Sequence, residues 1–305
     1  MRSLGHAATA LACLAWQAGG LCAPTDDPEQ CSALVSVGVA LRIEGWEQKA
    51  NWMTNQSFCT WEGITCGSTG QVTNLTLEKN GLRGYVPPAI GGLRSLQSFN
   101  INGKRPSTYH GCQGNDLQHS ALPAELFSLR NLTTLFAENA CIGGTIPRGV
   151  GQLRKLQIAK LHNNAISGTI PVEFNGLPEL RWFDLGRNAL SGTFPDLRDN
   201  HKLEKFSCNF CALTGTVPDI FDGFPNLQHT FWDGNALSGS LPPSLGSPNL
   251  KKLCCVSFDI NRMSGAVPPG LCELPALTDC RIGADVDAGA YLGAGNDLCA
   301  MPFLF

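Results

Sequence analysis

A short phrase, a glycine and two variable residues followed by a proline, returns about every two dozen residues along this 305-residue chain. It appears as Gly168-Thr-Ile-Pro171, Gly192-Thr-Phe-Pro195, Gly215-Thr-Val-Pro218, Gly239-Ser-Leu-Pro242 and Gly265-Ala-Val-Pro268. A period of this size, held over many copies, is typical of repeat proteins in which each unit packs only against its neighbours. The sequence therefore predicts one stack of repeats rather than two compact domains.

Each repeat contains a short strand followed by a bend. In the unit that begins at Leu180, apolar residues stand at Leu180, Phe183, Leu185 and Leu190. Phe183 and Leu185 flank Asp184, so we expect the two apolar side chains to point inward and the carboxylate to point outward. Asn188 stands where the chain bends away, and a short amide there can satisfy backbone groups that no strand pairing reaches.

The same positions recur in neighbouring units, with Cys208 and Cys211 at the second inward strand position and the asparagine position of one of them. From about Val72 to Pro268 the pattern resembles the leucine-rich repeat family, and its Leu-x-Gly-x-Ile-Pro ending resembles the plant-specific subclass. The resemblance implies an α/β solenoid: a right-handed superhelix with a parallel, concave β-sheet, a short helical or irregular convex side and disulfide-bonded caps. One repeat is too small to fold alone, so stacking must supply its stability.

Residues 24–71 lack the repeat and carry Asn51-Trp52 and then Cys59-Thr-Trp-Glu-Gly-Ile-Thr-Cys66. This segment resembles the N-terminal cap of plant leucine-rich repeat receptors and polygalacturonase-inhibiting proteins. The resemblance implies that Trp61 and a helix from the apolar stretch 33–48 cover the first repeat, and that Cys59 and Cys66 form a disulfide. Repeats are expected over 72–270, with an insertion near 103–114 and an irregular C-terminal cap over 271–305. Adjacency suggests a bond between Cys112 and Cys141.

The first residues are typical of a secretory signal peptide. Arg2 precedes a small and apolar stretch, and we expect cleavage after Ala23, which gives a leader of residues 1–23. Removing Cys13 and Cys22 from the 14 cysteines leaves an even set of twelve, as in extracellular disulfide-bonded proteins. No later segment approaches the roughly 20 apolar residues of a membrane span. The expected location is secreted, extracellular or associated with a cell wall, with glycosylation at the Asn-x-Ser/Thr sites Asn55, Asn74 and Asn131.

Composition and motifs argue against several function classes. The net charge is −3, and the basic residues are scattered, so nucleic acid is not an expected partner. Cys208-Asn-Phe-Cys211 has the spacing of a redox pair but lies at repeat positions expected to be buried. No catalytic motif, phosphate loop or metal-ligand spacing is present in the sequence. We therefore expect a protein that is not an enzyme, with no cofactor and no metal.

The outward strand positions predict a binding face. Trp182, Phe210 and Phe231 are interleaved there with charges of both signs, a composition found in recognition hot spots. The alternative, that these aromatic rings only cover the sheet, stays open. The expected centre of contact is Trp182, Lys205, His229, Phe231 and Asp184, joined by Lys160, His162, Arg187 and Phe210, with the loop at Tyr109 above it.

Three functions follow from these features. The first is a secreted recognition protein that binds a protein, a peptide or a glycan on its concave face. The second is an inhibitor of a secreted hydrolase, as the similarity to polygalacturonase-inhibiting proteins implies, although the near-neutral face weakens it. The third is a receptor ectodomain without its membrane span and kinase, or a partner of a membrane receptor. Oligomeric state is not encoded in any feature of the sequence.

Overall fold

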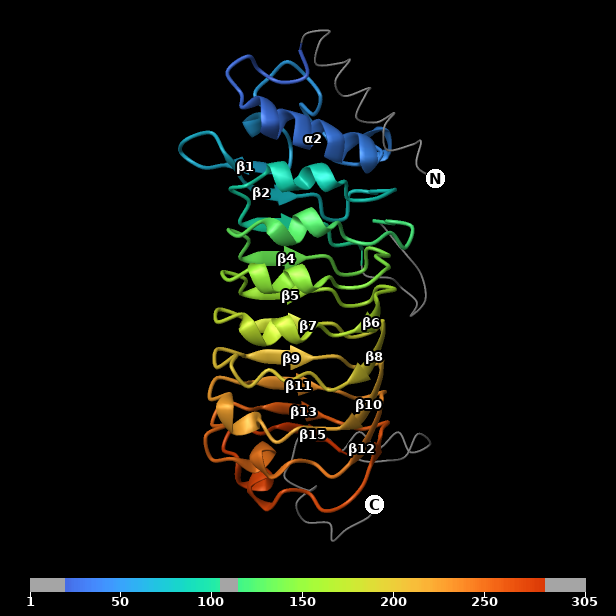
Figure 1. Cartoon of the computed structure of the whole chain (residues 1–305), viewed down its shortest axis with the longest axis vertical. Coiled ribbons are helices and arrows are strands. Elements are labelled where there is room, and N and C mark those ends of the chain that lie inside the picture. Colours follow the sequence, from blue (N-terminus) through green and yellow to red (C-terminus); the bar gives the residue numbers. More distant parts are fainter. Residues whose placement is uncertain (1–19, 105–114, 283–305) are drawn as a thin grey trace. The chain divides into compact units, whose positions relative to one another are not determined.

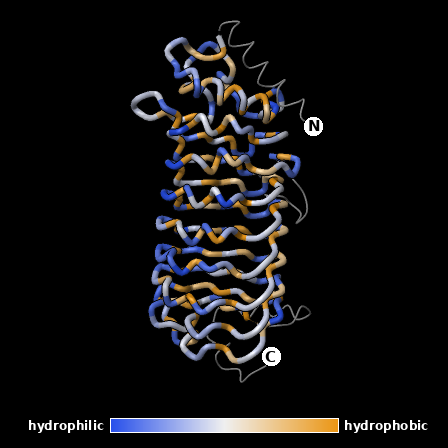
Figure 2. Tube along the Cα trace, viewed as in Figure 1, coloured by the Kyte–Doolittle hydropathy of each residue, from blue (hydrophilic) through white to orange (hydrophobic). Residues whose placement is uncertain are grey.

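The computed structural model describes residues 20–104 and 115–282. The described residues divide into two compact units: residues 20–104, 115–156 and 163–166 belong to the first, and residues 157–162 and 167–282 belong to the second. Within each unit, successive coils stack strand on strand (Figure 1). Hydrophobic residues recur at equivalent places in these coils (Figure 2), as stacked repeats with a shared core require.

A cap opens the first unit. Helix α2 (Pro28–Ala40) begins where the Asp27 side chain accepts a hydrogen bond from the Gln30 amide at 2.8 Å, with a proline in its first turn. It ends before Arg42, whose φ of 55° is left-handed. The helix therefore lies earlier than the predicted stretch 33–48, and short 3-10 helices follow at η1 (Ile43–Gly45) and η2 (Phe58–Thr60).

Three tryptophans fill this cap. Trp61 is 1% exposed. Its ring centroid lies 5.0 Å from that of Trp52, which in turn lies 4.8 Å from that of Trp46. The predicted Cys59–Cys66 disulfide is present, and a second bond joins Cys22 to Cys31. Trp61 is thus buried within the cap, and its covering of the first repeat stays a prediction.

Within its described residues, the first unit contributes four strands to a sheet. Strand β1 (Ile64–Cys66) pairs antiparallel with β2 (Val72–Thr76), and β3 (Ser98–Asn100) and β4 (Thr134–Phe136) continue the sheet in parallel. The 3-10 helices η3 (Pro88–Gly92), η4 (Ala124–Ser128) and η5 (Arg148–Gln152) lie between coils. Each follows a proline in extended conformation, namely Pro87, Pro123 or Pro147. The repeated proline thus marks where each coil turns into its short helix.

The second unit contains two parallel sheets. The large sheet is formed by β5 (Ile158–Lys160), β7 (Trp182–Asp184), β9 (Lys205–Ser207), β11 (His229–Phe231), β13 (Cys255–Ser257) and β15 (Asp279–Arg281). The second sheet is formed by β6 (Ser167–Thr169), β8 (Ala189–Thr193), β10 (Ala212–Thr216), β12 (Ala236–Gly239) and β14 (Arg262–Met263). Helices η6 (Val172–Gly176), η7 (Phe221–Gly223), η8 (Pro243–Gly246) and η9 (Pro269–Glu273) lie between coils.

Apolar side chains fill the space between these sheets. Phe183 and Leu185 are fully buried, as predicted, and the Phe183 ring stacks on that of Phe206 at 5.7 Å. The amide of Asn188 donates to the carbonyls of Leu161 and Leu185 at 3.0 and 2.8 Å. Asn235 and Asn261 repeat the arrangement in later coils. This asparagine ladder satisfies bend carbonyls that strand pairing leaves open. The predicted leucine-rich repeat solenoid, with parallel strands and few helices, is confirmed.

The C-terminal boundary differs from the prediction. An irregular cap was expected from residue 271, yet η9 and β15 continue the repeat, and β15 pairs with β13 in register. Leu277, Cys280 and Ile282 keep the spacing of Leu180, Phe183 and Leu185, with a cysteine in place of a larger residue. Residues 283–305 of the predicted cap, and most of the insertion at 103–114 with Tyr109 and Cys112, lie outside the described residues.

Two further cysteines of the described residues are paired. Cys141 and Cys272 are both disulfide-bonded. Cys112, the partner suggested for Cys141, lies outside the described residues. Among residues 20–104 and 115–282, no helix combines the length and the apolar character needed to cross a bilayer.

Candidate ligand-binding face

The candidate site is the side of the large sheet of the second unit that points away from the core, called the outer face below. Two successive amides at the start of β7, β9, β11, β13 and β15 share one carbonyl of the preceding coil. Arg181 and Trp182 both donate to the Gln157 carbonyl, at 2.8 and 3.0 Å, and Gln228 and His229 both donate to that of Glu204. This sharing disturbs the strand alternation, so neighbouring side chains such as Arg181 and Trp182 meet on one face.

The structure places the predicted residues on one continuous strip. Strand pairing aligns Ile158, Trp182, Lys205, His229, Cys255 and Asp279 in one column. A second column holds Lys160, Asp184, Ser207, Phe231, Ser257 and Arg281. His162, Arg187 and Phe210 follow the ends of their strands. All nine residues expected to bind a ligand thus belong to the second unit and to adjacent coils.

A cationic side chain lies beside each of the three aromatic rings Trp182, Phe231 and Phe210. Lys160 Nζ lies 4.5 Å from the ring centroid of Trp182, and Lys205 Nζ lies 5.7 Å from that of Phe231. The Arg187 guanidinium lies 4.6 Å from the Phe210 ring. Such contacts stabilise a ring at the surface and fix its orientation. The outer face therefore presents aromatic surface with positive charge beside it.

Trp182 is the most clearly anchored of the rings. It is 37% exposed, and its indole Nε1 donates to Glu204 at 3.0 Å. Glu204 also accepts from the Arg181 guanidinium. Burial opposes ionisation of Glu204, but hydrogen bonds from Arg181 and Trp182 outweigh it and lower the pKa of this carboxyl. A ring held in this way loses little conformational entropy when a ligand packs on it.

Asp184 differs from its expected role. Its carboxylate was expected to point outward and to lie at the centre of a ligand contact, but the residue is only 6% exposed. Lys205 Nζ lies 2.8 Å from one oxygen, and His162 Nδ1 lies 3.5 Å from the other. Burial alone would raise the pKa of Asp184, yet the hydrogen bond from His162 and the charge of Lys205 hold it well below its usual range. Asp184 therefore positions the side chains of Lys205 and His162 and is not itself open to a ligand.

His229 lies between a cation and a ring. Its ring centroid is 6.0 Å from that of Phe231. Burial, and then the charge of Lys205, lower the pKa of His229, so its imidazole is neutral at pH 7. A neutral imidazole can donate and accept hydrogen bonds, which suits an uncharged polar group of a ligand.

One position per coil carries backbone strain. The residue directly before the ladder position has a left-handed φ, 54° at Arg187, 51° at Phe210 and 53° at Ile260. Glycine and asparagine adopt this conformation easily, whereas bulky and β-branched residues do so at a cost. Phe210 and Ile260 nevertheless stand there, 40% and 38% exposed. The Phe210 ring lies over Gly234, where an added Cβ would approach it to 2.5 Å.

The predicted columns of outward residues ended two coils too early. Cys255, Ser257, Asp279 and Arg281 extend the two columns, and Arg281 pairs with Asp279 at 3.0 Å. Leu253, Val256 and Phe258 show the same spacing as earlier coils, so this extension was readable from the sequence. Cys208 is buried, as expected, and its sulfur lies 3.0 Å from that of Cys211.

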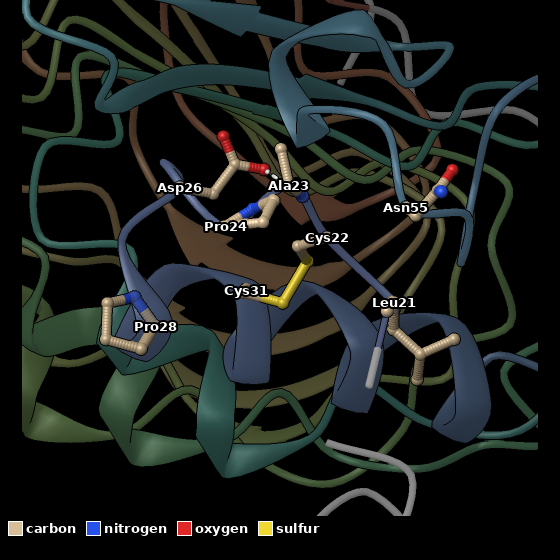
Figure 3. A pocket seen from close by; sticks show the side chains of 9 residues that line it. Leu21, Cys22, Ala23, Pro24, Asp26, Pro28, Cys31 and Asn55 are labelled. Carbon is tan, nitrogen blue, oxygen red and sulfur yellow. Dashed lines mark hydrogen bonds between the residues drawn. A yellow bond between two sulfur atoms is a disulfide. The ribbon is translucent and has the colours of Figure 1, made fainter. Parts of the chain in front are cut away.

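The other predicted sites lie in the first unit. Asn55 is exposed, Asn74 lies on β2, and the amide of Asn131 is bonded to the Arg94 carbonyl and to Lys155. Their glycosylation stays a prediction. Asn55 also lines a pocket of about 550 Å³ beside the Cys22–Cys31 disulfide (Figure 3). Its one carboxylate, Asp26, already accepts from the amides of Ala23 and Phe58, so the pocket offers a ligand little polar recognition.

Several known proteins are similar to parts of this chain. No family model matches the chain. Phytosulfokine receptor 1 of Arabidopsis thaliana is 28% identical over 109 residues, covering 35% of this chain and 9% of that protein. Polygalacturonase inhibitor 1 of Oryza sativa subsp. japonica is 28% identical over 81 residues, covering 26% of this chain and 23% of that protein. The chain thus matches less than a quarter of the length of these relatives.

A solved structure that is similar to this chain is also that of a plant receptor. The receptor kinase HAESA of Arabidopsis, crystallised with the peptide hormone IDA and the co-receptor SERK1, superposes with a TM-score of 0.63. The match has 26% sequence identity and covers 74% of this chain and 36% of that one. The relatives of this chain include plant leucine-rich repeat receptor-like kinases and a polygalacturonase inhibitor, and its structural neighbours include leucine-rich repeat receptor ectodomains.

Proposed function

We propose that this chain is a secreted leucine-rich repeat recognition protein that binds a peptide or a protein segment on the outer face of its second unit. The observation that carries the proposal is the strip of Trp182, Phe231 and Phe210, each with a cation beside its ring. Aromatic and arginine side chains held in this way are the usual anchors of protein interfaces.

The polypeptide class is favoured over a glycan by the solved relative. HAESA, which shares this fold, was crystallised with a peptide hormone. An extended peptide needs anchors along its length, and Trp182 and Phe231 lie on strands β7 and β11, two coils apart in the sheet. The neutral His229 and the cations Lys160 and Lys205 supply polar contacts between them.

Binding by matched variants tests the proposal. The full chain is immobilised, polypeptides captured from the extracellular medium of its source are identified, and their affinity is measured for each variant. Trp182→Ala with Phe231→Ala should weaken binding by about 30-fold or more, since each anchor contributes about 1 kcal/mol or more and the two together about 2 kcal/mol or more. Val172→Ala, on η6 and 63% exposed, is the matched control and should leave binding unchanged.

Unfolding temperature separates binding from folding. Both variants should unfold close to the wild-type temperature, because their side chains are partly exposed. If the double variant bound as tightly as wild type, the assignment of the face would be wrong. If its unfolding temperature fell in step with its affinity, the two rings would serve the fold and the proposal would fail.

The inhibitor function is the second candidate, and the similarity to the rice polygalacturonase inhibitor favours it. Under that function the captured polypeptide is a secreted hydrolase, and its activity falls in stoichiometric proportion to added protein. A captured polypeptide without hydrolase activity would instead favour the recognition function over the inhibitor function.

A further inference from the structure

A cluster of one imidazole and two thiols lies on the outer face beside Phe231 and shares His229 with the proposed ligand-binding residues. His229, Cys254 and Cys255 each offer one ligand atom, and these atoms all lie within 4.8 Å of one another. Cys254 Sγ is 3.5 Å from His229 Nε2 and 2.9 Å from Cys255 Sγ. His229 and Cys255 are register partners on β11 and β13, so the cluster depends on strand pairing and not on a loop.

Backbone bonds fix the cysteine pair on both sides. The amides of Cys254 and Cys255 both donate to the Gln228 carbonyl, at 2.9 and 3.2 Å. The carbonyl of Cys254 in turn accepts from the amides of Thr278 and Asp279. This is the shared-carbonyl arrangement seen at other strand starts, and it brings two adjacent side chains to one face. Because the fold already holds the ligands together, a metal would not have to order them.

We propose that His229, Cys254 and Cys255 form a binding site for a thiophilic divalent cation of the Zn²⁺ class, with a fourth position open to solvent. Two thiolates and one imidazole are a donor set that suits Zn²⁺. Tetrahedral bonds of about 2.3 Å to sulfur and about 2.0 Å to nitrogen place a sulfur and a nitrogen about 3.5 Å apart. The distance between Cys254 Sγ and His229 Nε2 already has this value.

The two sulfurs require a small adjustment. The same bond lengths place two coordinating sulfurs about 3.8 Å apart. Their present separation of 2.9 Å needs side-chain rotation to increase, and both cysteines are half-buried at the surface rather than packed in the core. The charge also balances, since two thiolates neutralise a divalent cation.

A thiol gives up its proton when it coordinates a metal, and an imidazole coordinates through the ring nitrogen that carries no proton. Metal uptake by two thiols should therefore release protons.

Cobalt and zinc binding to the full chain test this site. The protein is kept under mild reductant, its free thiols are counted, and Co²⁺ is added as a spectroscopic probe before competition with Zn²⁺. We expect one equivalent of Co²⁺ with thiolate-to-metal charge-transfer absorption that Zn²⁺ removes. Cys255→Ser and His229→Gln should each weaken Zn²⁺ by about 100-fold or more, because losing a ligand costs at least as much as losing its supporting contacts.

Control variants separate the loss of a metal ligand from other effects of a substitution. Cys280→Ser removes a free thiol that lies outside the cluster and should bind Zn²⁺ as wild type does. Cys254→Ser is the second ligand variant, and circular dichroism verifies that each variant is folded. Absence of metal uptake by the reduced wild type would overturn the proposal. Equal uptake by Cys255→Ser, or a Cys254–Cys255 disulfide that persists in the folded protein and prevents uptake, would do so as well.

Discussion

At the residue scale, each asparagine of the ladder donates hydrogen bonds from its side-chain amide to backbone carbonyls of the bend. Asn188 and Asn235 each donate to two or more bend carbonyls, with the nearest at 2.8 and 2.9 Å. Cys211 stands at the same place in the coil between them. Its sulfur lies 3.6 Å from the Leu185 carbonyl and 3.8 Å from that of Asn209, which are weak contacts for a thiol. This coil therefore lacks the hydrogen bonds that its neighbours have.

Restoring the amide should stabilise the second unit. In a Cys208→Ala background, where no bond between the two sulfurs can form, Cys211→Asn should raise the free energy of unfolding by about 1 kcal/mol. The expected gain comes from buried hydrogen bonds worth about 0.5–1.5 kcal/mol each. Denaturant unfolding with the structural disulfides intact measures the difference, and Cys211→Ser, too short to reach the carbonyls, is the control.

Two results would contradict this view of the ladder. Destabilisation by Cys211→Asn in that background would mean that the site has no room for the amide. An equal gain from Cys211→Ser would mean that hydrogen bonding to the bend carbonyls is not the cause.

At the scale of elements, the N-terminal segment is tied into the cap. Cys22 is bonded to Cys31, and Asp26 accepts from the amides of Ala23 and Phe58 at 3.1 and 2.8 Å. The expected cleavage after Ala23 would remove Cys22 and leave the buried Cys31 unpaired. Cleavage after Gly20 keeps the bond, and it places small residues, Ala18 and Gly20, at the two positions that signal peptidase reads.

The mature N-terminus checks this revised expectation. Mass spectrometry of the secreted protein should find a terminal peptide that begins at Leu21 and is linked to the Cys31 peptide without reductant. A terminus at Pro24 would show that the bond does not belong to the mature protein and would restore the original expectation.

The repeat spacing predicted the strands because the apolar residues that face the core lie close together in the sequence of each coil. Phe183 and Leu185 must alternate with Asp184 to reach the shared core, so β7 was readable from one coil. The burial of Asp184 was not readable, because Lys205 and His162 reach it from the coils on either side. The Cys22–Cys31 bond was missed because Cys22 was assigned to the leader. His229 and Cys254 are far apart in sequence and meet only through strand register.

At the scale of the whole molecule, the repeats carry similar apolar residues in the core but different residues on the outer face. The inward positions carry Phe183, Phe206 and Trp232, all fully buried. The outer face of the second unit departs from what stability alone favours, since Phe210 and Ile260 occupy left-handed positions with φ of 51° and 53°. Such a conformation costs roughly 1–2 kcal/mol for a bulky residue. We interpret this strain as retained for binding.

The most direct test is to measure unfolding and binding together for Phe210→Asn. Asparagine is the residue found at the same place at Asn163, with φ of 55°. Relief of strain should offset the lost ring contacts, so the free energy of unfolding should stay within about 1 kcal/mol of wild type. The affinity for the captured polypeptide should fall by about tenfold or more. A loss of about 3 kcal/mol in stability with unchanged affinity would show that the exposed rings serve the fold, and it would contradict the account.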